Sequence, residues 1–484
     1  MSAKSKLLRR LSAIYAARDK AGATATSVAT AKAAGISSFD VVSATGLAVG
    51  QSIRIDDGEN VERGEISTLV GTTVGLVKPL ERDHAAGFAV ITQTVYDLGD
   101  VKGQVGSTGT LEQTDVLSAM RRLKFQIIQG YQTEPVETAV YGVTPENLVF
   151  ALGAPLTAVT GTGASVDAPK VFQTAFDDID SENNVCIILK YVTQDGTTRV
   201  REWWGCAVDY SSYSVQLAIG QDGAVPLKFT CYGAMVDGDY TPTFTADTSK
   251  KAAKGKVFDK LTSVGIWAAG GGDTTVSVDA AAGDSSVTVA SAAGLTAGDY
   301  IAFGSDDTLE INYIPTGGIT GSVVTLAWPL LRAQATGVAV QIVTQTTFAA
   351  IGKDGVKLNI GGQTTPIQSG LRRLPLGMQA GNVDVALQMS LVEMSSSAFA
   401  YSRGIPQANV TNNRILLTEE LATATILGVF AKGLNKDGGT VLINALGPSQ
   451  DVASVATQFG SDPNAATTPF NVKPSSGIQI VTYA

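Results

Sequence analysis

The chain contains one stretch twice: residues 33–55 read AAGISSFDVVSATGLAVGQSIRI, and residues 281–303 read AAGDSSVTVASAAGLTAGDYIAF. The glycines of the two copies stay in step, so that Gly35, Gly46 and Gly50 fall on Gly283, Gly294 and Gly298. A repeat of this kind constrains the architecture more firmly than local propensity does. We therefore interpret the chain as two copies of one unit.

The similarity continues beyond this Gly-rich stretch on both sides. Glu62 matches Glu310, the triplet at 92–94 matches the one at 344–346, and the paired arginines Arg121, Arg122 match Arg372, Arg373. Residues 7–17 resemble 257–269 in their apolar spacing, and we interpret both as helical. Residues 99–115 and 352–369 are predicted to be long polar loops, for which a mobile surface loop without a partner is the alternative.

Each half then shows the same order of predicted elements. A short helix is expected at 143–153 and at 393–404, with Thr144 as the N-cap of the first and a glycine after each. A hairpin follows in each half, with Asp195-Gly196 and Asp437-Gly438 at the turns, because Asp-Gly between apolar runs favours a tight turn. A closing strand is predicted at 226–229 and at 468–471.

These elements predict a mainly β fold with two β-sandwich or β-barrel domains, each with a short helix, and two small Gly-rich β modules. The boundary between the halves falls in a polar and basic stretch at 237–256, which is typical of a surface connection. The predicted divisions are a helical segment at 1–23, a small module at 24–91, a larger β domain at 92–236, a linker at 237–274, a second small module at 275–343 and a second larger domain at 344–484.

The composition limits the classes of function. Charged residues make up only 16% of the 484 residues, so small, weakly polar side chains must cover much of the surface, and such surfaces suit packing against neighbours. A net charge of -9 disfavours a surface that grips phosphate backbones. No stretch approaches the roughly 20 apolar residues of a membrane span, and the N-terminal stretch lacks a signal-peptide core, so we expect synthesis in the cytoplasm. Three cysteines without metal-like spacing are interpreted as reduced core thiols.

The residues do not point to an enzyme. The one histidine, His84, falls where the second copy has Gln334, and we interpret it as a satisfied surface side chain. The acidic run at 177–180 lacks the spacing of a calcium loop. Trp203 and Trp204 alternate across a strand, which predicts one ring in the core and the other at a sheet or subunit contact; a carbohydrate platform is the alternative. We therefore predict no catalytic residue, no cofactor and no metal.

The order of elements in the larger domains, together with the flanking Gly-rich modules, resembles the tail tube proteins of long-tailed bacteriophages. The resemblance covers roughly 92–235 and 344–484 and depends on element order, since that family has no short motif to match. It implies a structural virion protein whose domains form rings of six that stack into a tube. With two such domains in one chain, it implies a homotrimer with pseudo-sixfold symmetry.

The resemblance also implies the partners and the location. The partners are further copies of the chain, a tape-measure protein, tail-end proteins, and genomic DNA that passes through the lumen during ejection without sequence-specific binding. The location is the virion tail, and no membrane partner is expected. Arg121, Arg122, Arg372 and Arg373 are predicted to form inter-subunit ion pairs, with solvated charge as the equal alternative. The rival function is a β-modular adhesion or carbohydrate-binding tail protein.

Overall fold

The protein is described from a computed structural model of the whole chain. The model describes residues 8–20, 25–56, 60–107, 110–117, 124–175, 185–193, 195–209, 211–217, 223–249, 251, 258–348, 351–367, 377–391, 410–411, 414–415, 427–450 and 468–484.

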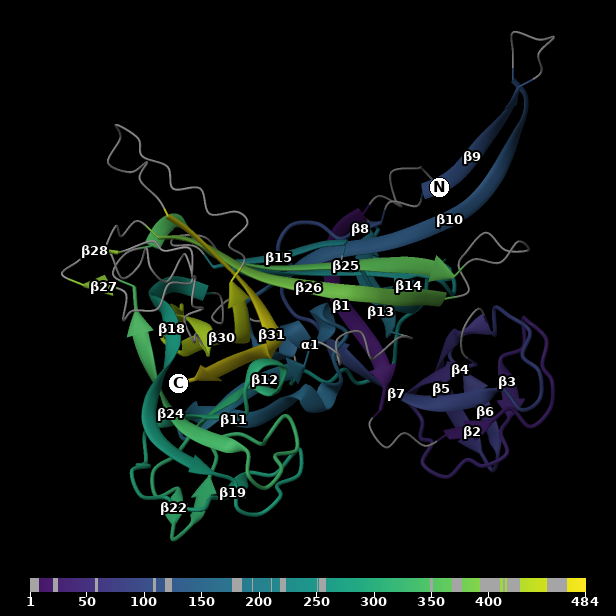
Figure 1. Cartoon of the computed structure of the whole chain (residues 1–484). Helices are drawn as coiled ribbons and strands as arrows, with labels where there is room; N and C mark the ends of the chain where they lie inside the picture. The colour runs from purple at the N-terminus through teal and green to yellow at the C-terminus, as the bar shows by residue number, and fades with distance from the viewer. Residues whose placement is uncertain are drawn as a thin grey trace.

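The fold is mainly β, as predicted, and two large antiparallel sheets dominate it (Figure 1). In the described part of the chain, the first sheet has 14 strands and the second has 12. The centre of the first sheet runs β7 (Ala89–Asp97), β1 (Leu8–Asp19), β13 (Val185–Thr193), β14 (Thr198–Val208). The second sheet has the matching order β24 (Ala339–Thr347), β18 (Phe258–Thr275), β29 (Gly428–Asn435), β30 (Thr440–Gln450).

The register of these strands repeats as well as their order. Ile14 pairs with Leu189 in the first sheet, and Val264 pairs with Ala431 in the second. Both strand pairs carry two irregularities at equivalent places, between Leu8 and Arg10 and between Phe258 and Lys260 for the first of them. The structure thus aligns Arg10 with Lys260, as the sequence comparison does. It aligns Thr94 with Thr344, two residues away from the sequence match.

The prediction of helices at 1–23 and 257–269 is wrong. The described part of the first segment is strand β1, and the second lies in strand β18. In β1, Ile14 and Ala16 belong to the main core, whereas Ala17, on the opposite side of the strand, packs under a small module. A strand that is buried on both faces reads as a continuous apolar run, so its period of two is hidden in the sequence.

The prediction of two long polar loops is wrong for 352–367 and for the strands within 106–115, whereas 99–105 lies between strand β7 and the next strand. Strand β25 (Ile351–Ile367) occupies almost all of 352–369 and forms a long hairpin with β26 (Gly377–Leu391). In the first half, β8 (Gly106–Ser107) and β9 (Thr110–Leu117) pair with β10 (Lys124–Tyr141), and Figure 1 shows β9 and β10 extending away from the body. The polar composition of these stretches suggested loops. Their backbone N–H and C=O groups are instead paired with partner strands, which the sequence of the stretch itself does not reveal.

The predicted linker at 237–274 is only in part a connection. Strand β18 begins at Phe258, inside that range. Upstream of it, the backbone of Asp247 exchanges hydrogen bonds with Val95 and Asp97 of β7, at 2.7 and 3.0 Å. The polar composition of this stretch therefore conceals a segment that packs along the first sheet.

The local signals for helix and turns are confirmed. Helix α1 (Pro145–Ala151) has Thr144 as its N-cap, whose hydroxyl oxygen accepts from the Asn147 N–H at 3.3 Å, and Gly153 follows with φ +58°. Hairpins β13–β14 and β29–β30 turn at Gly196 and Gly438, with φ of +85° and +86°. The closing strands are β16 (Ala224–Cys231) and β31 (Thr468–Tyr483). The helix predicted at 393–404 lies outside the described residues.

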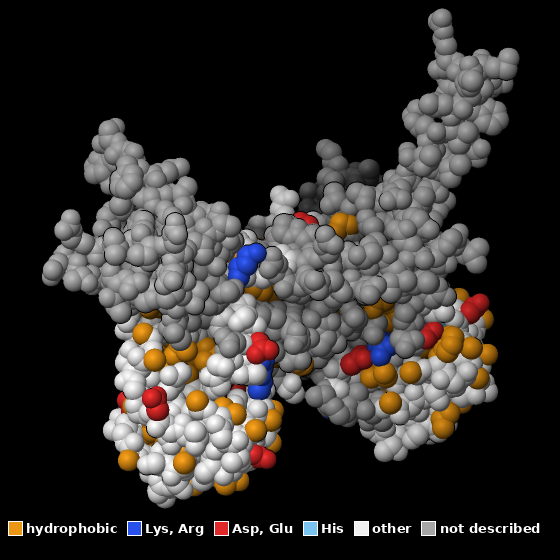
Figure 2. Space-filling view, in the orientation of Figure 1, with side chains coloured by type: hydrophobic (Ala, Val, Ile, Leu, Met, Phe, Trp, Pro, Cys, Tyr) orange, Lys and Arg blue, Asp and Glu red, His pale blue; other side chains and the backbone are white. Residues whose placement is uncertain are grey.

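Each half carries a small module with a core of its own, one within 28–90 and one within 276–340. The modules contain β2 (Ala25–Ser27), β3 (Ser38–Asp40), β4 (Ser52–Ile55), β5 (Glu62–Val70) and β6 (Thr73–Leu76), and β19 (Ser286–Thr288), β20 (Tyr300–Phe303), β21 (Glu310–Tyr313), β22 (Ile319–Thr320) and β23 (Val323–Thr325). On the face that Figure 2 shows, their described residues present mainly apolar and uncharged side chains with few charges. No described helix is long and apolar enough to cross a membrane.

Candidate assembly surfaces

The two halves are joined by strands that leave the first half and extend the sheet of the second. After α1, strands β11 (Val159–Ser165) and β12 (Ala168–Ala175) form a hairpin, and β12 pairs with β31 over six residues from Lys170↔Thr482 to Ala175↔Gly477. Further along, β15 (Ser211–Leu217) pairs with β25. Backbone hydrogen bonds of a sheet thus cross from one half to the other, which is the mode of association called strand addition.

Helix α1 fills the space between the two sheets. Its Leu148, Val149 and Phe150 are buried in a core that also contains Ile14 of the first sheet and Ile480 of the second. The Phe150 ring packs against the Tyr96 ring at 5.4 Å between centroids. The two large sheets therefore share one hydrophobic core, and neither sheet buries its inner face alone.

The first small module is held on its sheet by a buried ionic cluster. Glu202 of β14 accepts from Arg63 Nη1 at 2.5 Å, from Lys78 Nζ at 2.9 Å, from Trp204 Nε1 at 2.7 Å and from the Tyr240 hydroxyl. Glu202 and Arg63 are fully buried. Burial acts to raise the pKa of Glu202, but Arg63 and Lys78 outweigh burial and lower that pKa to about 2. The carboxylate is therefore ionised and binds the module to the sheet.

In the second half, an uncharged residue stands at the position of Glu202. Asn444 stands where the first half has Glu202, since the equivalent pairs are Ile188↔Glu202 and Phe430↔Asn444. It accepts from Trp267 Nε1 at 3.1 Å, and this ring packs against the Phe430 and Tyr300 rings at 5.3 and 4.9 Å. An aromatic cluster therefore replaces the ionic cluster.

One feature of the modules is shared. Glu62 accepts from the backbone N–H groups of Glu81 and Arg82, and Glu310 accepts from those of Leu331 and Arg332. Burial raises the pKa of the Glu310 carboxyl to about 7, against the lowering effect of those two N–H groups. Each carboxyl anchors a loop within its own module.

An arginine of the same loop also links each module to its sheet. Arg82 Nη2 donates to the Gly233 carbonyl at 2.9 Å, and Arg332 Nη2 donates to the Ser476 carbonyl at 3.1 Å. Both acceptors lie on equivalent stretches, after β16 and within β31. The two modules therefore dock in the same way despite their different packing.

The predicted residues fare differently. Arg121, Arg122, Arg372 and Arg373 lie outside the described residues, in 118–123 and 368–376, as does the acidic run at 177–180. The prediction that His84 is a surface side chain is wrong, because it is 1% exposed, with Nε2 at 3.0 Å from the Glu62 carboxylate. Its Nε2 is satisfied by Glu62, whereas its Nδ1 is buried without a hydrogen-bond partner among the described residues. Sequence reasoning missed Glu202, which lies in a hairpin strand and has no counterpart charge in the second half.

The predictions for tryptophan and cysteine are confirmed. Trp203 lies in the shared core, and Trp204 lies on the opposite face under the first small module. Both rings are buried, so neither presents an aromatic platform at the surface. Three thiols, Cys186, Cys206 and Cys231, are buried and free. Burial is the largest effect on Cys186 and raises its pKa to about 12, so the thiol stays protonated.

Comparison of the chain with protein-family models and with curated proteins finds no match.

Proposed function

We propose that the protein is the tail tube subunit of a long-tailed bacteriophage, and that it assembles into stacked trimeric rings of six tube domains. The observation that carries this proposal is the junction of the halves, in which β12 and β15 of the first half extend the sheet of the second. Two copies of one domain joined head to tail supply the contact that a ring repeats, and such a contact gives a closed ring where its rotation divides the full turn. Three chains would supply six domains.

One further feature supports a mechanical role over a catalytic one. Buried carboxylates at both small modules bind donors within the chain: Glu202, beneath the first module, accepts from four donors, and Glu310 of the second accepts from two backbone N–H groups. Buried charges with such complete pairing resist rearrangement. The expected partners are further copies, a tape-measure protein, tail-end proteins and DNA in transit, and no catalysis is proposed.

The proposal is tested by mass and shape. Light scattering of the purified chain is expected to give the mass of three chains. Negative-stain microscopy is expected to show rings with six repeating domains, and stacks of these rings at higher concentration. A chain that remains a monomer under all conditions and binds glycans on an array would contradict the tube function and favour the adhesion protein. The buried positions of Trp203 and Trp204 argue against that rival.

A further inference from the structure

Among the described strands, the first sheet has an unpaired edge at the place where the second sheet is paired. Strand β17 (Met235–Gly238) pairs with β14 as the last part of β31 pairs with β30: Arg201↔Asp237 corresponds to Ile443↔Ile480. In the second half, the other side of β31 carries β12. Among the strands that the structure describes, β17 has β14 as its one neighbour.

The same contrast appears at a second edge. The outer side of β25 carries β15, whereas β9, its counterpart in the first half, has β10 as its one described neighbour. Both filled edges belong to the second half, and both filling strands come from the first. The contact is therefore directional: the first half donates strands and the second half accepts them.

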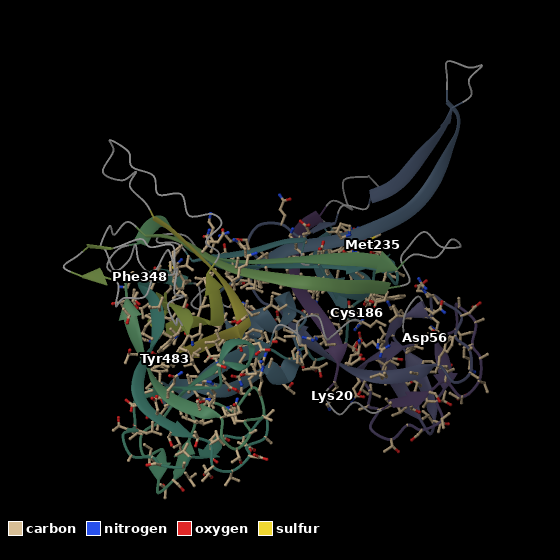
Figure 3. The ribbon with its side chains drawn as sticks, viewed as in Figure 1. Lys20, Asp56, Cys186, Met235, Phe348 and Tyr483 are labelled. Atoms are coloured by element: carbon tan, nitrogen blue, oxygen red, sulfur yellow. The ribbon has the colours of Figure 1, made fainter. Side chains whose placement is uncertain are left out.

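The face beside β17 is exposed to match. Met235 is 48% exposed, whereas Ile478, at the equivalent position of β31, is 1% exposed, in the core that also contains Leu148 and Phe172 of the first half. Figure 3 places Met235 well apart from Tyr483, so the two equivalent edges lie in different parts of the molecule. Met235 thus lies on a strand edge that no described strand pairs, and an unpaired edge is a template for pairing with another chain.

Polar groups surround Met235 on the same face. The Asp237 carboxylate accepts from Tyr191 Oη at 3.1 Å, from Arg199 Nη2 at 2.7 Å and from Arg201 Nε at 2.7 Å. They border a hollow of about 870 Å³ that Leu11 and Leu189 also line. Val441, Ile443 and Ile480, which stand at the positions of Arg199, Arg201 and Asp237 in the second half, are all buried. The first half is thus polar where the second half is apolar.

We propose that the outer edge of β17, with Met235, Tyr191, Arg199, Arg201 and Asp237, binds the second half of a second copy of this chain. We call these five residues the β17 surface. The contact repeats between chains the arrangement that β31 makes with β12 within the chain. This inference rests on the proposed ring, which requires one such contact between successive chains.

The chemistry of the surface fits a contact between chains. An interface within one chain is permanent and can be wholly apolar, whereas a subunit that folds before it assembles needs a polar surface to stay dispersed. Arg199 also pairs with Asp239 at 2.9 Å, so two arginines face two aspartates and the charges balance. Charged side chains on an edge strand discourage pairing with arbitrary strands, which leaves the matching domain as partner.

The test replaces Met235 in the full chain. Met235→Lys would place a charge in the new interface and is expected to lower the fraction of chains in rings at least about tenfold. Met235→Ile, which copies the residue of the second half, is expected to assemble as the wild type does. Val70→Lys, at a side chain that is 75% exposed in the first small module, is the control for added charge. Thermal unfolding verifies that all three variants fold.

The outcomes separate this inference from the proposed function. If the wild type forms rings and Met235→Lys forms them equally well, the proposal for the β17 surface is contradicted and the tube function is not. The same holds if Val70→Lys loses its rings to the same extent as Met235→Lys. A wild type that forms no rings contradicts the tube function itself. Mixing provides a second readout: Met235→Lys keeps its second half intact and is expected to cap wild-type chains, so that small amounts shorten assemblies.

Discussion

The two small modules sit on equivalent strands, but opposite kinds of chemistry hold them there. Under the first module, Glu202 gathers two cations, and the Lys78 ammonium also lies 4.5 Å from the centre of the Trp204 ring. Under the second, Asn444 stands in the place of Glu202, among aromatic rings. The strand registers beneath the two modules are nevertheless the same.

The comparison teaches that a duplicated backbone constrains positions more than side chains. In both halves an indole N–H donates to the residue at the equivalent position of the hairpin, yet Trp204 comes from β14 and Trp267 from β18. In the first half, Ala17 of β1 stands at the position of Trp267. In the second half, Gly428 lies opposite Trp267 and leaves room for its ring. Side chains therefore changed in compensating sets.

The largest expected effect comes from mixing the two chemistries. Glu202→Asn, which copies the second half, would leave Arg63 and Lys78 without their main carboxylate, and we expect a loss of about 3–5 kcal/mol in the free energy of unfolding. Urea denaturation followed by tryptophan fluorescence measures the loss. Asn444→Ala is the matched control in the second half, where no charge loses a partner.

A double-mutant cycle sharpens this prediction. Adding Arg63→Ile, the residue at the equivalent position Ile311, removes one of the two stranded cations, so the double variant should be more stable than the sum of the two single losses predicts. Strict additivity would show that Arg63 and Glu202 do not stabilise each other.

The next effect concerns pH. The pKa of Glu310 is about 7 in the folded protein, above its ordinary 4.5, so the folded state holds the proton more tightly. This contribution, roughly 3 kcal/mol, is complete below pH 4.5 and is lost as the pH rises from 4.5 to 7. Glu310→Gln should therefore reduce the change in the stability of the second small module between pH 4.5 and pH 7. Hydrogen exchange in strands β20 and β21 measures that stability. If the variant's stability depended on pH as the wild type's does, the prediction would be contradicted.

Glu202 should behave in the opposite sense. Its pKa is lowered to about 2, so its contribution is complete above pH 4.5 and is lost as the pH falls from 4.5 toward 2. Hydrogen exchange in β4 and β5 should therefore accelerate in acid before that in β20 and β21. Simultaneous loss of both modules would show that their stabilities are not separable.

The smallest effect concerns the exchanged volumes. A Cβ added at Gly428 would lie 2.9 Å from Trp267 Cδ1 and 3.0 Å from the Ala445 carbonyl oxygen, so Gly428→Ala should cost about 1–3 kcal/mol. Chemical denaturation measures it. Cys186→Ala at the equivalent position removes an atom and creates no clash, so a similar loss there would contradict the steric explanation.

The features that sequence could predict are those written in a few neighbouring residues. Thr144 with Pro145 predicts the start of a helix, and Asp195-Gly196 and Asp437-Gly438 predict hairpin turns. These predictions succeed because capping and turn chemistry act over about three or four residues. The features that it could not predict depend on distant partners. Glu202 meets Arg63 across 139 residues, and no local pattern signals that contact.

The sequence by itself determined that the chain is mainly β, that it is a duplication, and where its turns and first helix lie, since repeats and turn residues are local. Only the tertiary structure decided that β1 and β18 are strands, because both faces are buried over residues 16–18 and 264–267, where the alternation is lost. It also decided that β12 and β15 leave the first half for the second. The choice of partner for a strand edge depends on which edges meet in space, and a strand's own residues do not encode that choice.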